Sequence, residues 1–217
     1  MEGIQKEKSK VDLKERILEN WALTYKSKQR IFTAKTENDL KHIIKFAHKN
    51  KLQISIKGSG QSYNEQSFVK NGVTIDMIAM NRINTIDINN KWLIVQSGCL
   101  ISEALKIIIL KGFTIGAIPG SDKVSFGGAF INFVHGKDSK TFGSLINNII
   151  EIKVILTNGK IKVIKRKNIP KILSFGLFFI VISLKIKLVK IRSNIIKTEK
   201  FFFDNINEMT EIIKSKQ

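Results

Sequence analysis

The chain has 217 residues, of which 43% are hydrophobic, and this composition excludes a disordered protein. Its formal charge of +19 would suit nucleic acid, but the lysines are spread along the chain without an arginine-rich cluster, zinc-finger spacing or RNA-binding aromatic motif. We therefore expect no nucleic-acid partner and no metal site, although the charge leaves a basic anion-binding or nucleic-acid-binding protein as an alternative.

The first predicted elements are helical. Residues 1–19 are expected to form an N-terminal extension, and Glu15 to Ala22 to form a short leading helix. The run TENDLKHIIKFAHKN predicts a longer helix, because Thr36 and the acidic residue three positions later come close to a capping box. Its apolar residues fall on one helical face, as a helix covering a core requires. They are Leu40, Ile43, Ile44 and Ala47.

Two strands and a glycine loop follow this helix. QISIK and GVTIDM read as strands on either side of KGSGQSYNEQ, so the order strand, helix, strand indicates an α/β layer. NTIDI and WLIVQSG then predict a hairpin that turns at Asn89-Asn90-Lys91. Ser102 is expected to cap the helix EALKIIILK, which ends at Gly112.

The second half of the chain begins with a glycine-rich region and ends in strands. The run from Phe113 to Ser144 has little periodicity, and Asn158-Gly159 then predicts a type I′ hairpin turn. The apolar run ILSFGLFFIVISL has 13 residues, fewer than the about 20 that span a membrane, so we expect no transmembrane segment. With the alternating tail KIKLVKI it predicts a further strand, followed by an extended piece and the first turns of a helix.

The loop KGSGQSYNEQ raises the question of anion binding. A P-loop would need Gly-Lys-Ser/Thr where Tyr63-Asn64 stand, and a Rossmann fingerprint would need a third glycine and an immediate helix. A strand that feeds a loop of unobstructed N–H donors can still form an anion nest. An ordinary surface turn remains the alternative for this loop taken alone.

A second cluster favours a ligand-binding function. IPGSDKVSFGGAF contains small residues and glycines that let a backbone approach a flat or charged ligand, and His135-Gly136-Lys137 follow. GSGQSY, IDMIAMNRINTIDI, PGSDKVSFGGAFINFVHGKDSKTFGS and TNGK together resemble the FAD-binding domain of the vanillyl-alcohol oxidase and p-cresol methylhydroxylase (PCMH-type) superfamily. The closest resemblance is to decaprenylphosphoryl-ribose oxidase-like and sugar-lactone oxidase members, and it covers residues 20–191.

The resemblance implies an α+β fold of two α/β subdomains with FAD between them. It implies that the first loop holds the FAD pyrophosphate through Gly58, Ser59, Gly60, Gln61, Ser62 and Tyr63. It places a second segment along the pyrophosphate, ribityl chain and ring, formed by Pro119, Gly120, Ser121, Val124, Ser125, Gly127, Gly128 and Ala129. It places His135, Gly136 and Lys137 by the isoalloxazine face.

The implied chemistry is oxidation of a CH–OH group of a sugar, polyol or sugar-linked lipid by hydride transfer to FAD. In this interpretation Lys137 steadies negative charge and His135 hydrogen-bonds flavin or substrate, while a structural histidine and a solvated lysine remain the alternatives. Family members with covalent flavin often carry a histidine where this chain has Gln61, so we expect non-covalent FAD.

Two departures from the family pattern affect these expectations. The glycine-rich stretch before the last strand of the domain is reduced to Gly176, although Ile180 and Val181 can still present backbone groups to FAD. Residues 192–217 correspond to the start of a truncated substrate (cap) domain. The chain can therefore be a fragment, depend on a partner chain that completes the active site, or be a flavin-binding remnant without turnover.

Cys99 is the single cysteine, so no internal disulfide is possible. This usage indicates a reducing compartment, and we expect a cytoplasmic protein in which Cys99 packs beside the strand WLIVQSG.

Overall fold

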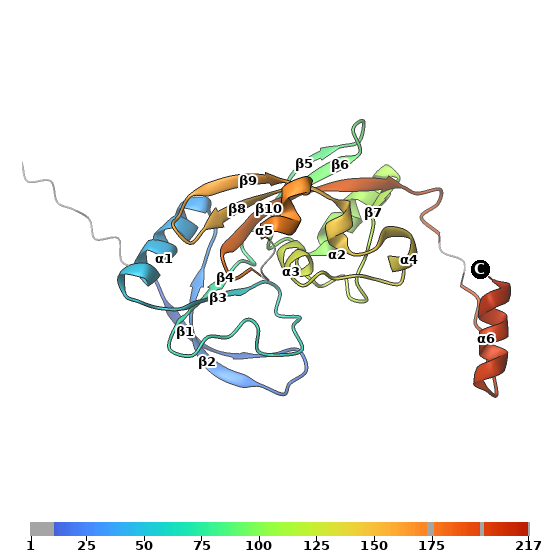
Figure 1. The fold of residues 1–217 in the computed structure, drawn as a ribbon, viewed down its shortest axis with the longest axis horizontal. Coiled ribbons are helices and arrows are strands. Elements are labelled where there is room, and N and C mark those ends of the chain that lie inside the picture. Colours follow the sequence, from blue (N-terminus) through green and yellow to red (C-terminus); the bar gives the residue numbers. More distant parts are fainter. Residues whose placement is uncertain (1–10, 173–175, 196–197, 217) are drawn as a thin grey trace, which may run out of the picture.

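A computed structural model describes residues 11–172, 176–195 and 198–216. Their secondary structure forms two sheets with helices packed around them (Figure 1). The first sheet has the order β1-β2-β4-β3. Its strands are β1 (Lys14–Glu19), β2 (Lys26–Thr33), β3 (Ile54–Lys57) and β4 (Val73–Asp76). β1 and β2 are antiparallel, whereas β4 runs parallel to both β2 and β3.

Helix α1 (Glu37–Lys49) makes the crossover between β2 and β3. Its N-terminus has the predicted capping box: Thr36 Oγ1 accepts from the Asp39 amide at 3.1 Å, and Asp39 Oδ2 accepts from the Thr36 amide at 2.9 Å. The predicted apolar face is the buried face of this helix. The strand–helix–strand layer therefore forms as its sequence predicts.

The second sheet has the order β5-β6-β10-β8-β9, and β7 pairs with β10. All of these pairings are antiparallel. The strands are β5 (Ile83–Asp87), β6 (Trp92–Gln96), β7 (Phe113–Ile115), β8 (Ile149–Leu156), β9 (Ile161–Lys165) and β10 (Phe179–Lys190). The helices and 3-10 turns of this half are α2 (Ile101–Ile108), η1 (Ile109–Lys111), α3 (Phe126–Ile131), α4 (Ser139–Phe142), η2 (Leu145–Asn148), η3 (Arg166–Asn168) and α5 (Ile169–Ile172).

Strand β10 connects the two cores. Phe179 and Val181 belong to the core of the second sheet, whereas Ile180 and Ile182 belong to the core shared by α1 and the first sheet. Because successive side chains of a strand point to opposite faces, a strand covered on both faces needs an unbroken apolar run. This explains why the run at 179–182 lacks alternation.

Three local predictions are wrong. Glu15 lies in strand β1, not in a leading helix, because residues 14–19 pair with residues 26–31 of β2. Ser102 does not cap α2: its amide donates to Asp122 O at 2.8 Å, and Leu100 is the N-cap residue. The turn at Asn158-Gly159 is not type I′, because only Gly159 has a positive φ (77°), while the Asn158 side chain accepts from the Lys160 amide.

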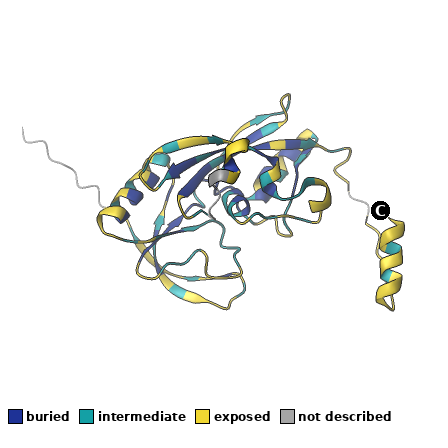
Figure 2. Cartoon of the chain, viewed as in Figure 1, coloured by how far each residue is buried: buried dark blue, intermediate teal, exposed yellow. Residues whose placement is uncertain are grey.

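The other predicted elements are confirmed. The β5–β6 and β8–β9 hairpins form, Gly112 ends the second helix with φ 79°, and the apolar run continues as β10, although residues 173–175 lie outside the described part. Helix α6 (Ile206–Ser215) lies apart from the body and has no buried residue (Figure 2). Among the described residues, no helix has the length and apolar character to cross a membrane.

Candidate functional site

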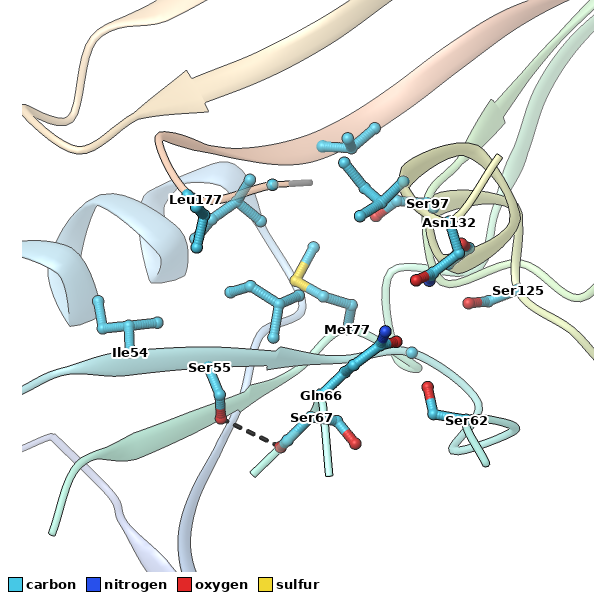
Figure 3. A pocket seen from close by; sticks show the side chains of 18 of the residues that line it. Ile54, Ser55, Ser62, Gln66, Ser67, Met77, Ser97, Ser125, Asn132 and Leu177 are labelled. Atoms are coloured by element: carbon cyan, nitrogen blue, oxygen red, sulfur yellow. Dashed lines mark hydrogen bonds between the residues drawn. The ribbon is translucent and has the colours of Figure 1, made fainter. Parts of the chain in front are cut away.

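A cavity of about 740 Å³ lies between the two halves of the molecule (Figure 3). This is within the range of small-molecule and cofactor sites. Three segments form most of its wall: β3 with the loop that follows it, the N-terminal part of α3, and the beginning of β10 with the residues before it. The cavity therefore lies where the two cores meet.

The first wall is the glycine loop after β3. Gly58, Gly60 and Ser62 line the cavity, and Gly60 has φ 77°, a left-handed conformation that favours glycine. Within the described residues, the amides of residues 59–62 donate no hydrogen bond. Consecutive unpaired amides are the donors with which a backbone nest holds an anion.

The second wall comes from the start of α3, where Ser125, Gly127 and Gly128 line the cavity. The two glycine-rich loops are bonded to each other, because the Ser125 amide donates to Ser59 Oγ at 3.1 Å. A Cβ at Gly58 would overlap Ser125 Oγ, and a Cβ at Gly127 would lie 2.8 Å from Ser97 Cβ. Any side chain at 58 would therefore displace the Ser125 hydroxyl, and one at 127 would press against Ser97, whose carbonyl oxygen would also lie 3.1 Å from the Cβ.

The third wall is β10. Ile180 and Val181 line the cavity together with Phe179, Leu177 and Gly176. The strand has a register shift between Val181 and Ser183, which places Ile182 opposite no residue of β8. On the other edge of β10 its carbonyl accepts from the Ser97 amide at 2.9 Å, which extends the pairing with β6 by one residue and attaches the end of β6 to this wall.

Ser97 is a polar side chain on this wall that lacks a hydrogen-bond partner among the described residues. The residue is 3% exposed and lines the cavity, yet its Oγ has no hydrogen-bond partner among the described residues. An unpaired buried hydroxyl costs about 1–3 kcal/mol. The Oγ atom itself is closed off from solvent, so a polar ligand in the cavity would relieve that cost only after the Ser97 side chain turned to another rotamer.

The cavity wall carries no charge: no Asp, Glu, Lys, Arg or His is among the described residues that line it. An ion pair lies at the start of the glycine loop, where Lys57 Nζ is 3.2 Å from Asp76 Oδ2. The same ammonium group donates to Gly58 O at 3.2 Å. Asp76 Oδ1 accepts from the Ile78 amide. This pair fixes the start of the loop, and an anion in the cavity would be held by amides and hydroxyls.

The structure brings part of the predicted site together. The predicted residues that line the cavity are Gly58, Gly60, Ser62, Ser125, Gly127, Gly128, Ile180 and Val181. Ser59 supports them through its bond to Ser125, whereas Gln61 is half-buried and Tyr63 is 69% exposed against the Trp21 ring.

The other predicted residues lie off this wall. Ala129 is buried in α3, and the Val124 carbonyl accepts from the Ile101 amide at the start of α2. Pro119 is half-buried, and Gly120 and Ser121 are exposed. His135 and Lys137 are exposed, with His135 in a β-bridge to Ser144, and a Cβ at Gly136 would overlap the Ile118 carbonyl.

The sequence interpretation missed several wall residues: Ser97, Met77, Gln66, Ser67 and Asn132. Asn132 lies one residue past α3, and its Nδ2 donates to Gly128 O at 2.9 Å. Figure 3 shows the Met77 side chain in the middle of the cavity, between β3 and α3. No glycine or charge pattern marks these positions, so only the fold reveals them.

Cys99 is close to the site but does not take part in it. The thiol is buried, and burial followed by the nearby Glu103 carboxylate raises its pKa to about 11. A thiol with that pKa is a poor nucleophile at neutral pH. Among the described residues, no group of His, Cys, Asp and Glu could hold a metal ion.

Comparisons with known proteins agree on one family. The FAD binding domain family matches residues 29–165, more than half of the chain. Decaprenylphosphoryl-beta-D-ribose oxidase of Mycolicibacterium smegmatis is 27% identical over 130 residues, which cover 60% of this chain and 28% of the relative. L-gulonolactone oxidase of Scyliorhinus torazame is 23% identical over 142 residues, which cover 65% and 32%.

The fold is shared with solved structures. Cholesterol oxidase from Brevibacterium sterolicum, as its His121Ala mutant, aligns with a TM-score of 0.72 and 18% identity over 82% of this chain and 38% of the other. The chain thus spans about a third of the length of the curated relatives that it matches.

Proposed function

This chain belongs to the FAD binding domain family, and from that premise we propose that it is the cofactor-binding part of an oxidoreductase that acts on CH–OH groups. The comparisons confirm the resemblance to the PCMH-type superfamily, the α+β fold class and FAD as the cofactor. The substrate and the reaction remain our proposal: a sugar, polyol or sugar-linked lipid, oxidised at a carbinol carbon.

The single observation that carries the proposal is that the lining of the cavity suits FAD. It combines backbone amides and hydroxyls with apolar side chains, and no charged residue is among the described lining residues. The residues that would hold the diphosphate are those of the glycine loop, whose amides at 59–62 donate to no described residue, and the start of α3 at Gly127 and Gly128. Ser97 Oγ, which lacks a partner among the described residues, would gain one from the cofactor once its side chain turned toward the cavity. Apolar side chains of β10 would cover a flat ring.

Non-covalent binding is supported by the same wall. The side chains that commonly form covalent flavin bonds are His, Cys and Tyr, and none of these types is among the described lining residues. Gln61, in the first loop, is an amide that cannot form such a bond. We therefore propose that the cofactor dissociates without bond cleavage.

The chemistry that FAD supplies when bound is acceptance of a hydride from a substrate carbon. This chain's contribution is to bind and to keep water from the apolar wall. A proton must also leave the substrate hydroxyl, and the described cavity wall has no titratable side chain to take it. We propose that His135 takes this proton while Lys137 steadies the negative charge on the substrate oxygen, or that a group from outside residues 11–191 takes it.

The domain boundaries are part of the proposal. Residues 20–191 form the FAD-binding domain, and the pairing of β1 with β2 supports including residues 14–19. Residues 192–217 are proposed to begin a substrate domain, consistent with an α6 that has no buried residue. A separate partner chain could equally complete the active site.

A flavin-binding remnant without turnover is the second candidate, and the absence of a titratable side chain from the described wall favours it. Both candidates bind FAD, so they are separated by activity.

The test is the visible absorption spectrum of the purified protein before and after acid precipitation. Flavin bands that pass into the supernatant support non-covalent FAD. Bleaching of those bands by a sugar or polyol under anaerobic conditions would establish the oxidoreductase, and stable bands would favour the remnant. A colourless protein that takes up no added FAD would contradict both.

A further inference from the structure

The turn between β1 and β2 rests on the glycine loop. The Trp21 amide donates to Ser62 O at 2.9 Å, and the Trp21 ring meets the Tyr63 ring edge to face at 4.8 Å between centroids. These contacts join segments that are about 40 residues apart in the sequence. The N-terminal hairpin is therefore attached to the loop that carries the unpaired amides.

Asn20 is the residue that makes this attachment specific. It is 3% exposed, and its Oδ1 accepts from the amides of Thr24 at 3.0 Å and Tyr25 at 2.9 Å. Its Nδ2 donates to Thr24 Oγ1 at 2.9 Å and to Tyr63 O at 2.6 Å. Both lone-pair sites and both donors of the amide are used, which only Asn in this orientation allows.

The bonds to the loop are all made to its carbonyls. In a trans peptide the C=O of one residue and the N–H of the next point in opposite directions. When Ser62 O faces Trp21 and Tyr63 O faces Asn20, the following amides of Tyr63 and Asn64 point away from the hairpin. The hairpin thus holds the C-terminal end of the loop by its carbonyls, directly after the cavity-lining Ser62, and its described bonds use none of the amides of residues 59–62.

We propose that Asn20 is a positioning residue: it holds the Tyr63 carbonyl against the hairpin, next to the Ser62 carbonyl that the Trp21 amide holds, and so presets the glycine loop for the FAD diphosphate. This inference rests on the proposed function for its ligand. It acts through preorganisation, because a loop already in its bound conformation loses less conformational entropy on binding. Asn20 itself is not one of the residues that line the cavity.

Two substitutions distinguish the bond from Asn20 to Tyr63 O, which is the bridge to the loop, from the bonds that Asn20 makes within the hairpin. Asn20→Asp keeps the two acceptor bonds from Thr24 and Tyr25, but a carboxylate has no hydrogen to donate to Tyr63 O. Thr24→Val removes the bond from Asn20 to Thr24 Oγ1 and leaves the bridge to Tyr63 in place. The second variant is the matched control for the first.

The experiment measures, for wild type and both variants, the dissociation constant of FAD by flavin fluorescence and the hydrogen exchange of the Trp21 backbone amide by NMR. For Asn20→Asp we expect about 10- to 30-fold weaker FAD binding and about 10-fold faster Trp21 exchange, and for Thr24→Val less than about 3-fold change in either. The thermal midpoints of the two apo variants show whether both are folded.

Three results would overturn the proposal: an Asn20→Asp affinity within about 3-fold of wild type, unchanged Trp21 exchange in that variant, or an equal loss of affinity in Thr24→Val. A wild-type chain that binds no FAD would instead contradict the proposed function. The Trp21 exchange rates would then still decide whether Asn20 holds the loop.

Discussion

The glycine loop at residues 58–63 and the His-Gly-Lys segment at 135–137 resemble the same family, but they lie differently in the fold. The loop is bonded to α3 through Ser59, to the hairpin through Ser62 and Tyr63, and it lines the cavity. His135 and Lys137 are exposed and lie off that wall. The difference supports the proposal that this chain builds the binding part of an FAD site, since the described cavity wall has no titratable side chain for proton transfer.

The largest effect is expected from a substitution in the glycine loop. In Gly58→Ala the new methyl group would overlap Ser125 Oγ, so that hydroxyl must turn away from the glycine loop or the two loops must separate. We expect FAD affinity to fall by about 100-fold, which is about 2.7 kcal/mol, in a fluorescence titration.

Two variants control this prediction. In Gly58→Ala with Ser125→Ala the closest remaining atom is Ser125 Cβ at 3.4 Å, an ordinary contact, so the affinity should recover at least about tenfold. Gly120→Ala has no atom within 4 Å of the added Cβ and should bind FAD within about 3-fold of wild type. Equal losses at 58 and 120 would mean that the contact between the loops is unimportant for binding.

A smaller effect is expected from a substitution at Ser97, which tests the contribution of the cavity wall between the two loops. Ser97→Ala removes the buried hydroxyl that has no partner among the described residues. We expect the apo protein to gain about 1 kcal/mol of unfolding free energy in urea denaturation, because an unpaired polar group is removed. FAD affinity should fall by about tenfold in the same variant, because Ser97 turned toward the cavity would make one hydrogen bond to the cofactor.

The opposite signs in apo stability and affinity are the test of Ser97. A variant that is less stable without FAD would show that the hydroxyl is paired in the free protein. An unchanged affinity would show that Ser97 Oγ makes no bond to the cofactor.

The smallest expected effect concerns the exposed segment. His135→Ala and Lys137→Ala should each change FAD affinity by less than about 3-fold, because both side chains lie off the cavity wall. If turnover is found, the rate of flavin reduction by substrate is where a role of either residue should appear. A loss of FAD affinity above tenfold would mean that the segment forms part of the binding site.

Elements with local signals were predicted from the sequence. The capping box at Thr36 and the stop at Gly112 depend on neighbours in the chain, and both are confirmed. The sequence singled out the first glycine loop as a candidate anion nest, and Gly58, Gly60 and Ser62 of this loop line the cavity.

Features that depend on distant partners were not predicted. The run KERILE contains good helix formers, but it is a strand because β2 pairs with it. Ser102 is a common N-cap residue, but the carbonyl of Asp122 already satisfies its amide. The sequence did not mark Ser97 or Asn20. Ser97 was identified because its buried hydroxyl has no hydrogen-bond partner among the described residues, and Asn20 because it bonds to Tyr63, a residue 43 positions away.

The central claim is that an uncharged wall of amides and hydroxyls holds FAD, although the chain carries a formal charge of +19. Its most direct test is an FAD titration at about 50 mM and about 500 mM salt, because salt screens surface lysines much more than a buried site. We predict saturable 1:1 binding with a dissociation constant that changes by less than about 3-fold. Binding that is not saturable, or that weakens by more than about 30-fold at the higher salt, would contradict the claim and indicate attachment to surface lysines.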